Sequence, residues 1–285
     1  MKDAIKNILK GAVIGVANII PGVSGGTMAV SMGIYDKLIH CVTHIFKEFK
    51  KSLKFLIPVG IGMALALVGL SFIIEAAFAH FPAQTNLLFI GLILGGLPAI
   101  LKKVKGNTIR LSHIIPAVIF FVLVVGLAAF GSGEGSDADL SFNVLNVLKL
   151  FGVGVIASAT MVIPGVSGSM ILMLMGYYQP VIETISTFVR ALTAFDVPVL
   201  LQCCGILVPM GIGIVVGIVV IAKLIEIVFE KWPLVAYWAI IGLIAASPIA
   251  IILMSEFGTI TVVTVLTSVV TFVLGFAGAK LLGEE

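Results

Sequence analysis

Long runs of apolar residues, separated by short polar stretches, make up most of the chain. A transmembrane helix needs about 20 predominantly apolar residues, with a range of about 17–25. Six runs fit that length, and they are residues 55–75, 84–101, 111–130, 201–222, 234–251 and 258–279. The pattern predicts an all-α polytopic membrane protein with six full transmembrane helices.

An eight-residue pattern occurs twice, as IIPGVSGG at 19–26 and as VIPGVSGS at 162–169. A second block repeats further along each half, where PVGIG at 58–62 corresponds to PMGIG at 209–213. Self-similarity of this kind indicates two copies of one structural unit. The two repeats are predicted at 1–140 and 141–285, divided by the polar run 131–139.

The apolar segments that flank each PGVSG tip differ from the six long runs. These arms are residues 11–20 and 27–39 in the first repeat, and 150–163 and 170–183 in the second. At about 1.5 Å of rise per residue, each arm is too short to cross a membrane alone. Length leaves two alternatives, a broken spanning helix or a re-entrant hairpin that returns to its own side.

Basic residues favour the re-entrant alternative, because cytoplasmic loops carry an excess of Lys and Arg. The start of the chain and the stretch 47–54 are both rich in lysine, which places both ends of the hairpin 11–39 inside. The loop 102–110 is basic as well, whereas 76–86 and 131–139 contain no Lys or Arg. We therefore expect both termini in the cytoplasm. Lys149 and Arg190 are minor exceptions to the rule, because this topology places these two basic residues outside.

Three full spans in the first repeat turn the second repeat upside down, so its hairpin 150–183 enters from outside. The expected fold is an inverted-topology repeat of six transmembrane helices and two re-entrant helical hairpins in the cytoplasmic membrane. Secondary transporters commonly have this arrangement, with the binding site at the repeat interface near the midplane.

Composition supports the membrane class and excludes others. The chain is 60% hydrophobic and 11% charged, whereas soluble domains average about 25% charged residues. The net charge of +3 comes from short basic loops, which report topology and not nucleic-acid binding. The three cysteines, Cys41, Cys203 and Cys204, show no metal-ligand or disulfide spacing, and we expect neither a metal nor another cofactor.

The two tips are the candidate binding site. Non-helical backbone at membrane depth must be buried in protein or line a water-filled cavity. A half-helix is expected to start after each tip, near Thr27 and near Met170, and helix N-termini favour anions such as phosphate. The candidate binding residues are Asn18, Gly22, Ser24, Gly25, Gly26, Thr27, Thr160, Gly165, Ser167, Gly168 and Ser169.

Enzyme functions suggested by the same residues are not favoured. GVSGG at 22–26 fits the G-x-S-x-G nucleophile elbow, which needs an α/β sheet, and it also resembles the serine motif of rhomboid intramembrane proteases. A serine nucleophile needs a base within hydrogen-bond reach, but all four histidines lie in the first repeat. We expect a transporter, with Asp36 and Glu75 as candidate sites for a coupling H⁺ or Na⁺ ion.

The paired tips, together with GIYD at 33–36 and GYY at 176–178, resemble the bacterial and archaeal polyprenyl-phosphate transporter family over nearly the whole chain. The resemblance implies a translocase that returns undecaprenyl phosphate, the lipid carrier of cell-envelope precursors, to the cytoplasmic leaflet. The second tip departs from the first, with Ser169-Met170 in place of Gly26-Thr27. The alternative function is an ion-coupled secondary transporter of another anion.

Overall fold

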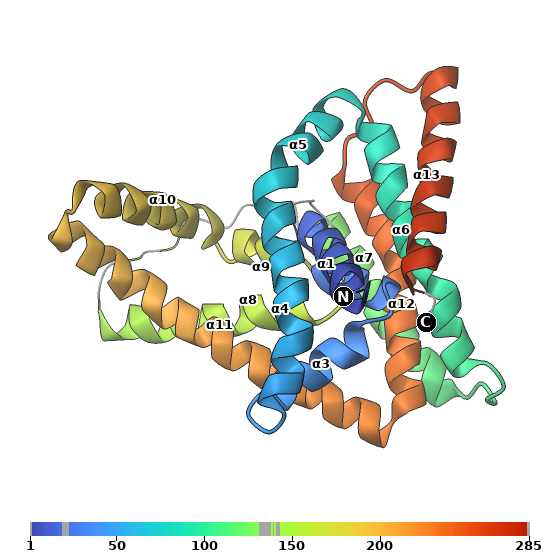
Figure 1. Ribbon diagram of the computed structural model, residues 1–285, viewed down its shortest axis with the longest axis horizontal. Helices are drawn as coiled ribbons and strands as arrows, with labels where there is room; N and C mark the ends of the chain where they lie inside the picture. The colour runs from blue at the N-terminus through green and yellow to red at the C-terminus, as the bar shows by residue number, and fades with distance from the viewer. Residues whose placement is uncertain (1, 19–22, 131–137, 139, 141–142, 284–285) are drawn as a thin grey trace. The chain divides into compact units, whose positions relative to one another are not determined.

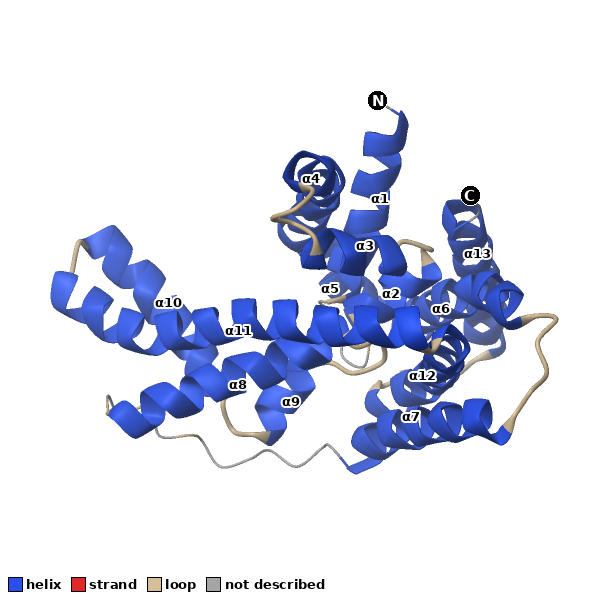
Figure 2. Ribbon diagram, turned by 90° about the horizontal axis from the view of Figure 1, so that it is seen from below, coloured by secondary structure: helices blue, strands red, loops and turns tan. Residues whose placement is uncertain are grey.

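The computed structural model describes residues 2–18, 23–130, 138, 140 and 143–283 (Figure 1). Within these residues every regular element is helical (Figure 2). Seven helices are long and apolar enough to cross a membrane, namely Phe49–Leu70, Pro82–Val104, Leu111–Ala129, Val144–Val162, Val197–Lys231, Pro233–Met254 and Val262–Gly283. The prediction of a multi-pass helical membrane protein is confirmed, and six of these helices overlap the six predicted spans.

The seventh helix, α8 (Val144–Val162), corrects one expectation. We predicted that the arm 150–163 is too short to cross a membrane, but the helix has 19 residues and extends about 28 Å. The extra length lies at its start, where the Asn143 side-chain oxygen accepts a hydrogen bond of 2.8 Å from the Asn146 N–H. This cap lets the helix begin before the predicted arm. The matching helix of the first repeat, α1 (Lys2–Ala17), has 16 residues.

The arms that follow the tips are each broken into two helices. Helix α2 (Gly25–Ser31) and helix α9 (Gly168–Leu174) have seven residues each. They end before Gly33 and Gly176, whose φ angles of 67° and 74° lie in the left-handed region. Glycine adopts that conformation without steric cost. The chain then re-enters helical structure as α3 (Tyr35–Thr43) and α10 (Tyr178–Ala194).

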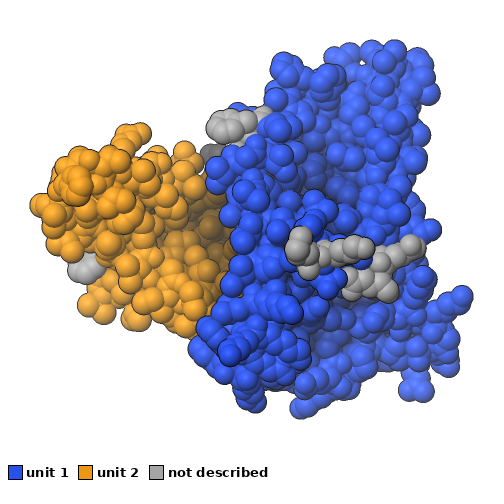
Figure 3. All heavy atoms as spheres, in the orientation of Figure 1, with its two compact units in different colours: residues 1–129, 163–166, 222–285 blue, residues 130–162, 167–221 orange. Residues whose placement is uncertain are grey.

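The chain forms two compact units that do not coincide with the two repeats (Figure 3). Unit 1 contains residues 1–129, 163–166 and 222–285, and unit 2 contains residues 130–162 and 167–221. The last two long helices of the second repeat belong to unit 1, because they pack against helices of the first repeat.

Glycines allow that packing in unit 1. Helix α6 (Pro82–Val104) lies beside α13 (Val262–Gly283), and Gly91 is so close to the Phe272 carbonyl that a Cβ there would overlap it. Helix α12 (Pro233–Met254) approaches α7 (Leu111–Phe130) in the same way, with Gly242 against the Ala117 carbonyl. Small residues let membrane helices approach this closely. Gly91 and Gly242 occupy the same position in the repeat.

A second pair of equivalent contacts occurs once in each unit. In unit 1, Gly11 of α1 meets the Val59 carbonyl of α4 (Phe49–Leu65) with no room for a Cβ. In unit 2, Gly154 of α8 meets the Met210 carbonyl of α11 (Val197–Lys231) in the same way. The same helix–helix contact is thus made by both halves of the sequence. Between α4 and α6 lie the π-helical turn η1 (Ala66–Leu70) and α5 (Ser71–His80).

Contacts near the two ends of α13 distinguish two ends of unit 1. At the start of α13, a Cβ on Gly258 would lie 3.1 Å from the Pro82 side chain. At the other end, a Cβ on Gly33 would lie 3.3 Å from the Gly283 carbonyl. Segments predicted outside therefore meet at one end of this helix, and segments predicted inside meet at the other.

Candidate functional site

The first tip presents a buried hydroxyl with no partner. Ser24 precedes α2 with extended backbone, and its side chain makes no capping hydrogen bond. Its Oγ atom is buried and has no hydrogen-bond partner among the described residues. An unsatisfied buried polar group costs about 1–3 kcal/mol. A hydroxyl kept at this cost is available to a ligand.

Backbone N–H groups without an intrahelical partner follow Ser24 along the chain. The first hydrogen bond of α2 runs from the Met28 N–H to the Ser24 carbonyl, with a length of 3.2 Å. The N–H groups of Gly25, Gly26 and Thr27 precede it and have no partner within the helix. All three residues are buried. The tip sequence contains no Lys or Arg, so the donors that the tip itself offers are neutral.

Asn18 and Gly25, both predicted site residues, lie together. A Cβ on Gly25 would stand 2.5 Å from the Asn18 Oδ1 atom. The amide of Asn18, an exposed residue, therefore covers the start of α2, and only glycine leaves space for it. Gly22 is the one predicted site residue outside the described part of the chain.

The second tip has related geometry with different side chains. A Cβ on Gly168 would lie 3.0 Å from the Met161 side chain and 3.4 Å from the Thr160 Oγ1 atom. The hydroxyl of Thr160 donates to the Ala157 carbonyl over 2.7 Å. Ser167 and Ser169 hydrogen-bond each other over 2.8 Å. These hydroxyls already have partners, in contrast to that of Ser24.

One hydrogen bond joins the two tip sequences. The Gly165 N–H donates to the Thr27 Oγ1 atom over 2.7 Å, and both residues belong to unit 1. Thr27 is fully buried, and Gly165 has a φ of 83°. The hydroxyl oxygen of Thr27 is therefore used to hold the second tip sequence against the first.

We expect Thr27→Val to destabilise the protein, because the half-buried Gly165 N–H would lose its acceptor. The expected cost is about 1–3 kcal/mol, measured as a lower midpoint of thermal unfolding in detergent. Thr27→Ser keeps the hydroxyl and serves as the matched control. Equal stability of the two variants would contradict a structural role for this hydrogen bond.

Of the two candidate coupling residues, Asp36 has a hydrogen-bond partner and lines a cavity, whereas Glu75 is exposed. Its Oδ2 atom accepts a hydrogen bond of 3.1 Å from the Tyr237 hydroxyl. Asp36 also lines a cavity of about 340 Å³ together with Lys102 and Lys103, at the end of unit 1 where the predicted inner segments meet. Glu75 is exposed on α5.

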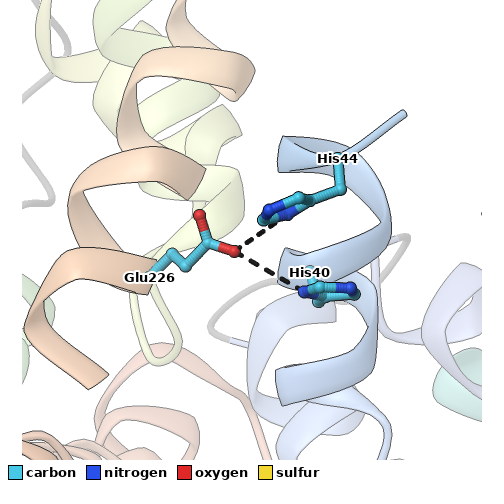
Figure 4. A group of neighbouring side chains, drawn as sticks. All are labelled: His40, His44 and Glu226. Atoms are coloured by element: carbon cyan, nitrogen blue, oxygen red, sulfur yellow. Dashed lines mark ion pairs between the residues drawn. The ribbon is translucent and has the colours of Figure 1, made fainter. Parts of the chain in front are cut away.

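The sequence argument missed a cluster formed by His40, His44 and Glu226 (Figure 4). The spacing of the two histidines places them on one helix face, and that signal was available from sequence. Glu226 comes from α11, far along the chain, and only the fold brings it to them.

Comparison with known proteins gives two kinds of match. A family model described as undecaprenyl phosphate translocase-like matches residues 14–208. A polyprenyl-phosphate transporter of Staphylococcus aureus (strain NCTC 8325 / PS 47) is 32% identical over 282 residues, covering 98% of this chain and 95% of the relative. A polyprenyl-phosphate transporter of Vibrio cholerae serotype O1 (strain ATCC 39315 / El Tor Inaba N16961) is 32% identical over 199 residues, covering 65% of this chain and 61% of the relative. No solved structure matches the chain significantly.

Proposed function

This chain belongs to the undecaprenyl phosphate translocase-like family, and we propose that it translocates a polyprenyl phosphate across the cytoplasmic membrane. The cargo is the lipid carrier of the cell envelope, which the protein returns for reuse without changing it chemically. The two relatives described above are both named polyprenyl-phosphate transporters. Its seven apolar helices suit a substrate that never leaves the bilayer.

The observation that carries the proposal is the buried hydroxyl of Ser24 at the first tip, which has no hydrogen-bond partner among the described residues. A phosphate monoester carries about −1.5 to −2 charges near neutral pH, and moving such a charge through hydrocarbon unaided is prohibitive. The Ser24 hydroxyl and the N–H groups at the start of α2 offer the donors that phosphate requires. The isoprenoid tail stays in lipid while the headgroup crosses.

We further propose that the hairpins 11–39 and 150–183 are re-entrant and enter from opposite sides, as parts of an inverted repeat, although α8 alone is long enough to cross a membrane. The equivalent contacts of Gly11 and Gly154 support two copies of one fold. The hydrogen bond between Thr27 and Gly165 supports two tips that meet. On the ground of the repeated sequence motif alone, we also propose the remaining tip residues, Thr160, Ser167, Gly168 and Ser169, as phosphate-binding residues. Asp36 is the better candidate for a coupling H⁺ or Na⁺ ion.

The proposed topology places both termini in the cytoplasm. A cysteine at Lys105 should be labelled from inside, because this exposed residue directly follows the end of α6. A cysteine at Thr259 should be labelled from outside, because this exposed residue precedes the start of α13. The measurement is labelling of intact cells with an impermeant maleimide, in a background that lacks Cys41, Cys203 and Cys204. Labelling of both positions from the same face would contradict the model.

Reconstitution tests the function directly. Proteoliposomes with labelled polyprenyl phosphate in one leaflet should equilibrate it between leaflets faster than protein-free vesicles. Uptake of a soluble anion without lipid movement would favour the alternative, an ion-coupled transporter of another anion. Release of free phosphate or polyprenol would instead indicate an enzyme.

A further inference from the structure

Three metal-ligating side chains converge at the end of α3. The His44 Nδ1 atom lies 3.1 Å from Glu226 Oε1, and the His40 Nδ1 atom lies 3.6 Å from the same oxygen (Figure 4). All three ligand atoms lie within 4.8 Å of one another. Ligands bound to zinc at about 2.0–2.2 Å in tetrahedral geometry stand about 3.3–3.6 Å apart. The cluster therefore has nearly the spacing that one ion requires.

Two helices of unit 1 build the cluster. His40 lies in the last turn of α3 and His44 follows as its C-terminal cap, and the two rings stack with centroids 4.3 Å apart. Glu226 belongs to the part of α11 within unit 1 and is only 7% exposed. A buried carboxylate needs compensating partners. The ligand set forms only when α3 and α11 are packed together.

The surroundings orient the Glu226 carboxylate. Glu226 Oε2 pairs with the Lys223 ammonium, which leaves Oε1 directed at the histidines. Oε1 also accepts a hydrogen bond of 2.9 Å from the Thr43 hydroxyl. Carboxylate oxygens have lone pairs for both this bond and a metal.

A second carboxylate stands behind His40. Glu48 Oε2 lies 3.9 Å from the His40 Nε2 atom, on the ring edge opposite Nδ1. Glu48 Oε2 also pairs with the Lys51 ammonium over 2.8 Å. At 3.9 Å the contact between Glu48 and His40 is electrostatic, and it is longer than the hydrogen bond by which an outer carboxylate fixes the tautomer of a ligating histidine.

We propose that His40, His44 and Glu226 bind one divalent transition-metal ion of the zinc class. Two imidazoles and one carboxylate suit such an ion, whereas Ca²⁺ and Mg²⁺ prefer oxygen ligands alone. Three protein ligands leave a fourth position for water or an anion. The bound ion would tie α3, which follows the first tip, to α11. The proposal does not depend on the transported substrate.

The test is titration of the purified, tag-free and metal-stripped protein with Zn²⁺, followed by calorimetry and thermal unfolding. We expect one ion per chain and a raised unfolding midpoint. His40→Gln/His44→Gln and Glu226→Gln should each bind zinc at least about tenfold more weakly, since loss of even an outer partner costs about 10–100-fold. His80→Gln, a histidine outside the cluster, should bind as the unmodified protein does.

Cobalt gives a second readout that does not rely on stability. Co²⁺ bound to nitrogen and oxygen ligands in tetrahedral geometry produces visible absorption, which the double histidine variant should lose even if it is less stable overall. Absence of stoichiometric zinc binding in the unmodified protein would overturn the proposal. So would equal zinc affinity in the double variant, or a stability that responds to acid but not to metal.

Discussion

Replacing Ser24 with alanine should reduce lipid transport at least tenfold while leaving the protein as stable as before, or more stable. Within the described part of the chain the Ser24 hydroxyl is buried without a partner, so its removal relieves a desolvation cost of about 1–3 kcal/mol. If the hydroxyl donates to phosphate, the same change removes a charge-assisted hydrogen bond worth about 1.5–3 kcal/mol. At about 1.4 kcal/mol per factor of ten, transport falls by one to two orders of magnitude.

A matched control exists in α13. The Ser268 hydroxyl is also buried without a partner among the described residues, but Ser268 lines an apolar cavity near the start of α13, together with Phe257 and Ile260. Ser268→Ala should leave or raise the unfolding midpoint and should not affect transport. Leaflet exchange in proteoliposomes and thermal unfolding are measured on both variants. If Ser24→Ala transports normally, this hydroxyl does not hold the phosphate.

The same comparison extends to the second tip. Gly25→Leu displaces Asn18, and Gly168→Leu displaces Met161 and Thr160, so both should abolish transport if both tips contact the headgroup. Gly60→Leu is the control, since a Cβ at Gly60 meets nothing within 4 Å. Loss of transport at Gly25 alone would restrict the site to the first tip.

Hydropathy predicted the architecture well, because spans in a membrane protein depend on local apolar length. The six long runs overlap six of the seven candidate spans. The seventh span, α8, was missed because Asn143 caps it at a position before the predicted arm 150–163, where the sequence looks like the end of a loop. The breaks after α2 and α9 were missed for a similar reason, since Gly33 and Gly176 reveal their left-handed conformation only in three dimensions.

The tips illustrate which part of a site sequence can predict. The starts of two short helices were expected near Thr27 and Met170, and α2 and α9 begin two residues earlier, at Gly25 and Gly168. The role of each hydroxyl could not be predicted. Ser24 is unpartnered whereas Thr27 accepts from Gly165, and this difference arises from contacts between segments distant in sequence.

Glu226 shows the same limit. Its carboxylate sits in a long apolar helix, where a charge is expected to find a partner. Lys223, one turn away, was visible in the sequence as that partner. The two histidines were not visible as further partners, because nothing in the sequence places His40 and His44 beside Glu226.

Polyprenyl phosphate should stabilise the purified protein more than either free phosphate or neutral polyprenol. Only the phosphorylated lipid fills a headgroup site and also contacts the apolar surface, so its affinity should exceed that of each part. A ligand present at 100 times its dissociation constant adds about 2.7 kcal/mol to stability. The measurement is the shift of the thermal unfolding midpoint in detergent at matched ligand concentrations.

Ser24→Ala sharpens this experiment, because it should selectively remove the advantage of the phosphorylated lipid. The neutral polyprenol should stabilise this variant and the unmodified protein equally, since its contacts do not involve the tip. The tip has no Lys or Arg, and an arginine clamp would hold phosphate more tightly. Binding by neutral donors should therefore be reversible, as release into the opposite leaflet requires. Equal stabilisation by polyprenol and its phosphate would mean that the tips do not recognise the phosphate group.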